Sequence, residues 1–284
     1  MNINERIAIA NNLSHDISRI QWPANAQEPD YVAKLVEVLP SYIANALAQV
    51  LPKRKVSAGG AFIHQKPLAH FVDKPSKHDP ELGDLLIVCR EKRSSGLVYN
   101  SMLLQAKISA NPFCERIPKD HQYILYSEWP EFEYKRAGSL NGKKRSILPK
   151  TITQGAQYLL IKKNNPRELF TATVDRPLNG SRLLAVTLSS ILSYDDGHTF
   201  QITRPRDDWS QMILDLLRLS ASSLFNRRRG GYRDARRWSG DKAFNFLLSS
   251  GAQDLDLSQH NMKGDDAGGI SIVCVDLGDA SAEG

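Results

Sequence analysis

The sequence predicts an α/β domain with a mixed central sheet, followed by a mostly helical addition. Two adjacent segments, Asp84–Cys89 and Leu97–Ile108, are strongly apolar and have the length of buried strands. A helical pattern and an extended segment precede them, and a further helix and strands follow. The chain has 284 residues, enough for one such core plus an elaboration, because domains commonly contain about 100–200 residues.

Two helices and an extended segment are expected before the apolar strands. Asn2–Ile20 carries apolar residues at roughly helical spacing. A second helix is expected to begin at Glu28 and to continue to Val50, with a kink at Pro40. Lys55–Phe71 then has extended character, and its Gly59-Gly60 pair indicates a bulge or a close approach of the backbone. The turn-like residues 90–96 predict that the next two strands form a hairpin.

The remaining elements alternate before they become mainly helical. We expect a helix over Pro118–Trp129, a loop or basic arm over Lys135–Lys150, strands over Gln157–Lys163 and Leu169–Val174, helices over Ser181–Ser193, Asp207–Asn226 and Asp241–Ser250, and a final strand over Ile270–Leu277. This pattern divides the chain into an N-terminal helical extension (1–28), a core (29–178) and a C-terminal elaboration with a basic loop and the final strand (179–284).

Composition excludes several classes of protein. Hydrophobic residues make up 41% of the chain and charged residues 24%, which is typical of globular proteins. No apolar run approaches the roughly 20 residues of a membrane-spanning helix, and the N-terminus lacks a signal-peptide pattern, so we expect a cytoplasmic protein. The three cysteines are too few and too scattered for a disulfide framework or a structural zinc site.

Positive charge is concentrated in two segments. Lys135–Lys150 contains basic residues and no acidic one, and Arg204–Arg237 contains nine arginines against four aspartates. In contrast, Gly251–Gly284 holds seven acidic residues and one lysine. Such asymmetry is compatible with binding a polyanion such as nucleic acid, and equally with a solvated basic surface.

The chemically informative residues lie on the two apolar strands. Asp84 begins one strand, and Gln105-Ala106-Lys107 lies near the end of the next. Side chains two positions apart on a strand share a face, so Gln105 and Lys107 point the same way, and a hairpin can bring Asp84 beside them. Mg²⁺ prefers oxygen ligands of this kind, including the Ala106 carbonyl, and a lysine can supply positive charge during phosphodiester cleavage.

Asp84 with Gln105-x-Lys107, set in this order of helices and strands, resembles the PD-(D/E)XK (restriction-endonuclease-like) nucleases and their αβββαβ core. The resemblance covers about residues 30–174 and implies a metal site at Asp84, Gln105 and Ala106 with Mg²⁺ as the usual ion and Mn²⁺ as a substitute. It also implies a catalytic role for Lys107 and a glutamate on the preceding helix. Glu37 is the best-placed candidate for that glutamate, and Glu28 is a weaker one.

A second element of the resemblance follows the strands. Gln122-x-x-x-Tyr126 is similar to the QxxxY motif of the RecB-like branch, and its spacing puts both side chains on one helical face, as contact with a nucleic-acid strand requires. The chain departs from the family pattern at two positions. Gln105 replaces the usual acidic residue and weakens metal binding, and Gly83 stands in place of the proline.

Several basic residues are candidates for contact with nucleic acid. These are Lys143, Lys144, Arg145, Arg227, Arg228, Arg229 and Arg233. The arginines lie near Tyr232 and Trp238, a mixture that suits phosphate contact and base stacking. The same cluster is also compatible with a loop between helices that pairs with the acidic C-terminal segment.

The sequence thus favours a divalent-metal-dependent nuclease, a phosphodiester hydrolase acting on DNA rather than RNA, either as a homodimer or with a partner protein. By analogy, such a chain resembles effectors of bacterial defence systems. The alternatives are a catalytically inactive nucleic-acid-binding or assembly subunit of the same fold, and an interaction module of a larger complex. Each candidate also has a structural interpretation: a turn cap for Asp84, a solvent-reaching strand-end lysine for Lys107, a surface residue for Glu37 and a packed aromatic for Tyr126. His64, on the extended segment before the site, is interpreted as a core histidine and is not included among the site residues.

Overall fold

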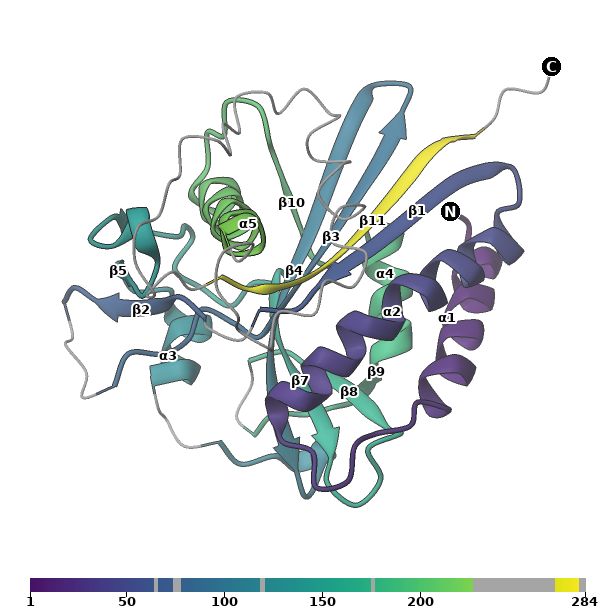
Figure 1. The fold of residues 1–284 in the computed structure, drawn as a ribbon, viewed down its shortest axis with the longest axis horizontal. Helices are drawn as coiled ribbons and strands as arrows, with labels where there is room; N and C mark the ends of the chain where they lie inside the picture. Colours follow the sequence, from purple (N-terminus) through teal and green to yellow (C-terminus); the bar gives the residue numbers. More distant parts are fainter. Residues whose placement is uncertain (64–65, 74–77, 118–120, 175–176, 227–268, 281–284) are drawn as a thin grey trace.

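A mixed central sheet with helices on both faces forms the body of the protein (Figure 1). The structure is a computed structural model that describes residues 1–63, 66–73, 78–117, 121–174, 177–226 and 269–280. The predicted α/β class with a mixed sheet is confirmed. The predicted helix at residues 241–250 and the arginines at 227–237 lie outside the described residues.

The central sheet runs along the path β1-β11-β3-β4-β7-β8-β9, and β10 pairs with β4 beside this path. Its strands are β1 (Arg54–Ala61), β11 (Ser271–Ala280), β3 (Leu85–Arg93), β4 (Gly96–Ser109), β7 (Ala156–Lys162), β8 (Leu169–Ala172), β9 (Arg182–Leu183) and β10 (His198–Phe200). The predicted hairpin is confirmed, because β3 and β4 are antiparallel neighbours. The pairs β11–β3 and β4–β7 are parallel, and the others along the path are antiparallel.

One face of the sheet is covered by α1 (Ile3–Ser18), α2 (Glu28–Val50) and α4 (Leu184–Leu192). The apolar stripe of α2 packs on β1 at Gly60, where an added Cβ would lie 2.4 Å from the Val36 carbonyl oxygen. This explains the glycine, since a larger residue would separate helix and strand. On the same face, Leu104 and Ala106 of β4 are fully buried.

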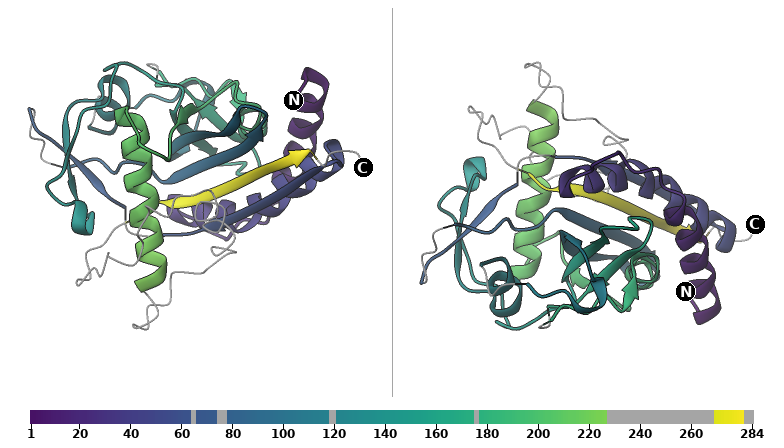
Figure 2. Two further views of the ribbon diagram at one scale, coloured as in Figure 1. Left: turned by 90° about the horizontal axis from the view of Figure 1, so that it is seen from above. Right: turned by 90° about the horizontal axis from the view of Figure 1, so that it is seen from below.

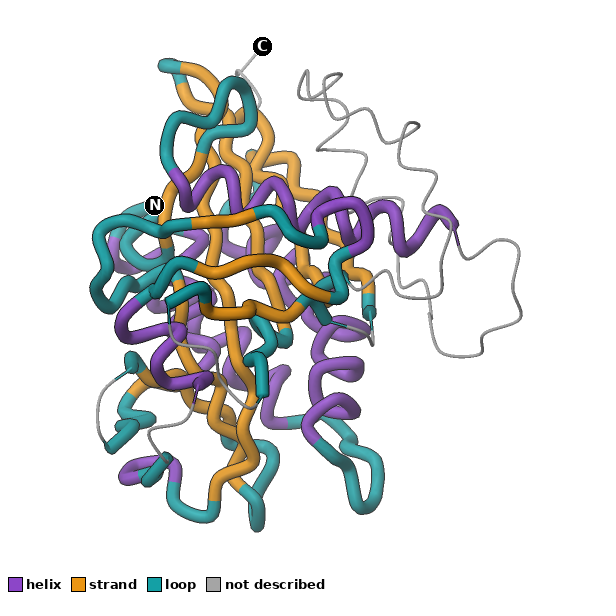
Figure 3. Tube along the Cα trace, turned by 90° about the vertical axis from the view of Figure 1, so that its left-hand side faces the viewer, coloured by secondary structure: helices purple, strands orange, loops and turns teal. Residues whose placement is uncertain are grey.

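The opposite face carries α3 (His121–Glu128), α5 (Asp208–Asn226) and a short second sheet of β2 (Leu68–Phe71), β5 (Phe132–Lys135) and β6 (Lys144–Arg145). Figure 2 shows α5 lying across the central strands on the side away from α1 and α2. The short sheet faces the viewer in Figure 3. Two 3-10 turns, Pro112–Cys114 and Gly138–Leu140, complete the described elements.

Two expectations for the connecting segments are corrected. The extended segment over Lys55–Phe71 is not continuous, because β1 and β2 belong to different sheets, and Pro67 between them has no N–H group to continue a ladder. The segment Lys135–Lys150 is not a free basic arm. It contains β6, and Arg145 Nη2 lies 2.6 Å from the fully buried carboxylate of Asp215 on α5.

The final strand has an integral place in the sheet. The prediction of a strand over Ile270–Leu277 is confirmed, and β11 lies between β1 and β3, although the sequence-based division placed it with the C-terminal elaboration. Val273 and Val275 enter the core beneath α2, whereas Ile272 and Cys274 enter the core beneath α5. Burial on both faces explains the continuous apolar run, which is typical of a central strand.

Among the described helices, none has the length and apolar character needed to cross a lipid bilayer.

Candidate functional site

Asp84 lies where β3 begins and where β4 runs past the end of its neighbour. The Asp84 N–H donates to the Leu104 carbonyl at 2.8 Å, and the Asp84 Oδ2 accepts from the Ala106 N–H at 2.7 Å. The carboxylate thus satisfies a backbone donor on β4 that β3 no longer reaches. Asp84 is only 2% exposed, so the carboxylate is held in a fixed position at this edge.

Gly83 allows this close approach. A Cβ at residue 83 would lie 2.7 Å from Leu103 Cδ1 and 2.9 Å from the Tyr126 hydroxyl oxygen. Proline, which is common at this position in the family that the sequence resembles, has a Cβ and would meet the same two atoms. The glycine is therefore required by the packing of β4 and α3 against the turn before Asp84.

Glu28 occupies the next position along the same edge of β4. Its Oε1 accepts from the Ile108 N–H at 3.1 Å. In a strand, the N–H and C=O groups of one residue point to the same side. The Ala106 carbonyl oxygen therefore lies on this edge of β4, between the Ala106 N–H that donates to Asp84 and the Ile108 N–H that donates to Glu28. Asp84, the Ala106 carbonyl and Glu28 therefore form a row of oxygens, which we call the β4 oxygen row.

Gln105 belongs to the same cluster but faces away from α2, since Leu104 and Ala106 on either side point into the core beneath that helix. Its Nε2 donates to Asp84 Oδ2, and the residue is 5% exposed. Its Oε1 is buried, and no hydrogen-bond partner for it lies among the described residues. An unsatisfied buried amide oxygen costs free energy, which a cation or an added donor would recover.

Lys66 and Glu81 complete the site, and sequence reasoning missed both. The Lys66 ammonium contacts Asp84 Oδ1 and lies 3.2 Å from Glu81 Oε2. Burial lowers the pKa of Lys66, but the carboxylates of Asp84 and Glu81 outweigh it and leave the pKa raised. The sequence did contain a sign of Glu81, because the spacing Glu81-x-x-Asp84 places a second carboxylate three residues before Asp84.

Lys107 lies two residues beyond Gln105 on β4 and shares its face, about 7 Å further along the strand. It is half-buried, and no described residue forms a hydrogen bond or ion pair with its ammonium group. Its charge is therefore available to an anion beside the β4 oxygen row. Of the three predicted residues, Asp84 and Gln105 are joined by a hydrogen bond, whereas Lys107 shares the strand face of Gln105 without a hydrogen bond or ion pair to either.

Glu37 is not part of the cluster. It lies on α2, over the face opposite to Gln105, and its Oε2 is 3.0 Å from Lys34 Nζ. The helix rises about 1.5 Å per residue, so Glu37 is about 13 Å along the axis from Glu28. The helix contributes a carboxylate through its N-terminal residue Glu28, the weaker of the two sequence candidates.

The QxxxY pair divides into two different environments. Tyr126 is fully buried, and its hydroxyl donates to the Leu82 carbonyl at 2.9 Å. Burial, and then the charge of Asp84, raise the pKa of Tyr126 well above its usual value. Tyr126 thus supports the turn before Asp84 and does not offer its ring to a nucleic acid. Gln122 is half-buried, and its Nε2 has no partner among the described residues.

The basic candidates also differ from one another. Lys143 Nζ lies 3.2 Å from Asp215 Oδ1, and Lys144 Nζ lies 3.8 Å from Glu131 Oε1, with both lysine side chains largely exposed. Arg145 has a side chain only 10% exposed and is committed to Asp215, so it is a structural residue. The candidates Arg227, Arg228, Arg229 and Arg233, and also His64, lie outside the described residues.

Comparisons of the chain with models of protein families, with curated proteins and with solved structures gave no match.

The cluster has the oxygen ligands that a hard divalent cation prefers. Two carboxylates, a backbone carbonyl and an orphaned amide oxygen lie around one strand edge. The described residues contain no group of three or more His, Cys, Asp and Glu side chains placed to hold a metal ion. A cation here would therefore depend on the Ala106 carbonyl, the Gln105 amide and retained water, an arrangement typical of Mg²⁺.

Proposed function

We propose that this chain is a divalent-metal-dependent nuclease of the PD-(D/E)XK type that cleaves phosphodiester bonds in DNA. The observation that carries the proposal is the β4 oxygen row with Lys107 beside it. The orphaned Gln105 oxygen supports it, because rotation of the amide by half a turn presents that oxygen to a cation beside Asp84.

Each residue has a role that its position supports. Asp84, the Ala106 carbonyl and Gln105 would hold Mg²⁺, for which Mn²⁺ is a substitute, and Glu28 would bind its water. When bound, the ion polarises the phosphoryl group and lowers the pKa of water. Lys107 would orient the attacking water and face the charge on the phosphate, since its ammonium has no competing partner among the described residues.

Charge balance favours this assignment. Glu28, Glu81 and Asp84 provide three carboxylates, whereas Lys66 and Lys107 provide two ammonium groups. The group is therefore net negative when it is empty and becomes net positive with one divalent ion. Such a site attracts a cation first and a phosphate afterwards, which is the order that metal-dependent phosphodiester cleavage requires.

A cleavage assay tests the proposal. The purified full chain is incubated with supercoiled and linear plasmid DNA in Mg²⁺, Mn²⁺ or EDTA. We expect metal-dependent cleavage that Asp84→Asn and Lys107→Ala reduce by about 100-fold or more, because each removes an electrostatic contribution to the transition state. The matched controls are Asp16→Asn on α1 and Lys163→Ala on the exposed surface. Cleavage that survives both site variants would refute the assignment.

One observation favours a second candidate, a catalytically inactive DNA-binding subunit of the same fold. Both oxygens of Asp84 are already engaged, one by Lys66 and the other by Gln105 and Ala106. In that case the cluster is a structural ion pair. Salt-dependent DNA binding without cleavage in any metal, and with no metal-induced shift in melting temperature, is the outcome that selects this candidate.

A further inference from the structure

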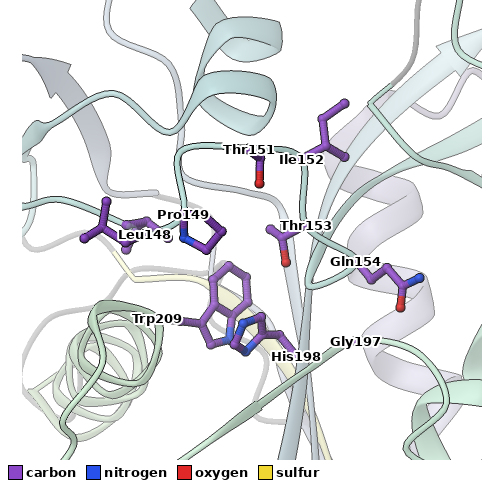
Figure 4. Close-up of a pocket in the computed structure, with 10 residues that line it drawn as sticks. Leu148, Pro149, Thr151, Ile152, Thr153, Gln154, Gly197, His198 and Trp209 are labelled. Carbon is purple, nitrogen blue, oxygen red and sulfur yellow. The ribbon is translucent and has the colours of Figure 1, made fainter.

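A pocket of about 320 Å³ opens on the α5 side of the central sheet (Figure 4). Its wall is the segment from Ile147 to Gln154, and its floor is formed by His198 and Trp209. Pockets for small ligands are about 300–1,000 Å³, so this one has room for a single nucleotide unit and not for a helix or a duplex.

The floor is aromatic and held rigidly. The rings of His198 and Trp209 lie 5.0 Å apart between centroids at an angle of 32°. Trp209 Nε1 donates to Ser101 Oγ at 3.0 Å, and His198 Nδ1 lies 2.8 Å from the Thr199 carbonyl oxygen. Gly155 lies directly against the Trp209 ring and the Cβ of His198, since a Cβ at residue 155 would be 2.6 Å from Trp209 Cζ2 and 2.7 Å from His198 Cβ. A planar ring that enters the pocket would lie against this aromatic floor.

The wall combines apolar and hydrogen-bonding groups. Leu148 and Ile152 are 64% and 45% exposed, unusually open for large aliphatic side chains. Thr151, Thr153 and Gln154 place hydroxyl and amide groups in the same lining. A nucleobase matches this surface, because it has an apolar face for stacking and a polar edge for hydrogen bonds.

Local charge favours the same ligand. The sequence has no acidic residue between Lys135 and Glu168, a range that includes the whole wall and the exposed Lys150. The nearest carboxylate in sequence to His198 is that of Asp196, which is buried and paired with Arg182. On the floor, Asp207 and Asp208 precede Trp209, and both carboxylate oxygens of Asp207 accept hydrogen bonds from Ser210. A phosphate attached to a bound base would therefore find the ammonium of Lys150 and no carboxylate on the wall itself.

The pocket and Gln105 of the candidate site lie on one face of β4. Ser101, which binds Trp209, and Gln105 are four residues apart, and side chains at even spacing on a strand point to the same side. The separation along the strand is about 13 Å. One strand of B-form DNA rises about 3.4 Å per nucleotide, so this distance corresponds to about four nucleotides, or fewer if the strand is stretched.

The spacing is also fixed by packing. Tyr126, which supports the turn before Asp84, stacks on Trp129 at 5.6 Å, and Trp129 meets Trp209 edge to face at 5.8 Å. This buried aromatic row joins the two places, so a ligand that bridges them meets a constant distance.

We propose that the pocket receives one unpaired nucleobase of the nucleic-acid strand whose backbone reaches the β4 oxygen row. The inference rests on the proposed nuclease function and adds that the substrate is single-stranded, or is opened, within about four nucleotides of the bond that is cleaved. Recognition is by stacking on His198 and by hydrogen bonds from the threonine and glutamine groups of the wall.

The test uses the full chain with Asp84→Asn, which prevents cleavage, and single-stranded oligonucleotides that carry 2-aminopurine at successive positions. One position should show quenched emission, and His198→Ala should abolish the quenching and weaken binding by about five-fold or more, as expected for loss of one stacked base. His198→Phe should restore both, because it restores an aromatic face. His15→Ala, an exposed histidine on α1, is the matched control.

Three results would overturn the inference: unchanged quenching in His198→Ala, equal quenching in a fully paired duplex, or equal affinity for free 2-aminopurine nucleoside, which would make the pocket a site for a free nucleotide. Cleavage by the unmodified chain is scored separately. If the chain cleaves DNA but the quenching does not depend on His198, only the pocket inference is refuted. If the quenching depends on His198 but no metal supports cleavage, only the nuclease proposal is refuted.

Discussion

Replacement of Lys66 by methionine separates the structural role of the buried ion pair from its place in a metal site. The side chains of Lys66 and Asp84 are 7% and 3% exposed, so solvent screens this pair very little. Loss of one partner from a buried pair costs about 3–5 kcal/mol, because it leaves an uncompensated charge. Asp84 keeps its bonds from Gln105 and Ala106, so we expect a loss near the lower value.

Chains of this size lose about 2 °C in Tm for each kcal/mol, so Lys66→Met should melt about 6 °C below the unmodified protein. Removing the ammonium also makes the site more negative. Mg²⁺ at a concentration of about 100 Kd should therefore raise the Tm of the variant by about 5 °C. The same concentration should raise the Tm of the unmodified chain by less. Differential scanning calorimetry with Mg²⁺ and with EDTA measures both effects.

Two further variants serve as controls. Lys162→Met removes the surface pair with Glu168, whose side chains are 31% and 39% exposed, and should cost less than about 1 kcal/mol. Adding Asp84→Asn to Lys66→Met removes the unpaired charge, so the double variant should be more stable than Lys66→Met and should show no Mg²⁺ shift. A Tm for Lys66→Met within about 2 °C of the unmodified chain, or a metal shift that persists in the double variant, would refute this reasoning.

Two other predictions follow from the same region. Tyr126→Phe should lower the free energy of unfolding by about 1 kcal/mol, because it leaves the Leu82 carbonyl without its donor, and should leave DNA affinity unchanged; a large loss of affinity in a filter-binding assay would restore Tyr126 as a contact residue. The stability that the Lys66 ion pair provides should be constant near neutral pH, should begin to fall above about pH 10.5, and should be lost as the pH rises through the raised pKa of the folded state. The sign follows from the raised pKa of the folded state, since the protonated amine is the form that folding favours. Urea unfolding between about pH 8 and pH 11 measures the difference in free energy of unfolding between the unmodified chain and Lys66→Met. A difference that does not change with pH would contradict the assignment.

Much of the local structure could be predicted from the sequence. The alternating and continuous apolar runs located β3, β4 and β11, and helical periodicity located α2, because burial imposes these periods directly on the residue order. The convergence of Asp84 and Gln105 could also be predicted, since a short turn between two strands leaves few ways to pair them.

Other parts of the site depend on contacts between distant segments. Lys66 lies 18 residues before Asp84 and reaches it from the segment that leads into the short sheet. The position of Glu28 rather than Glu37 beside β4 depends on where α2 crosses the sheet. The burial of Tyr126 and of Arg145 depends on the packing of α3 and α5. None of these arrangements has a period in the sequence.

The sequence by itself determined the long helices and the central strands β3, β4 and β11, and it singled out Asp84, Gln105 and Lys107 as candidate site residues, because each of these follows from local spacing. The tertiary structure decided which carboxylates join Asp84, which cation neutralises it, and that an aromatic pocket shares the face of β4 with the site. The physical reason is that side-chain direction is fixed over a few residues by backbone geometry. The meeting of distant charges is fixed only when the helices and the second sheet pack on the central one.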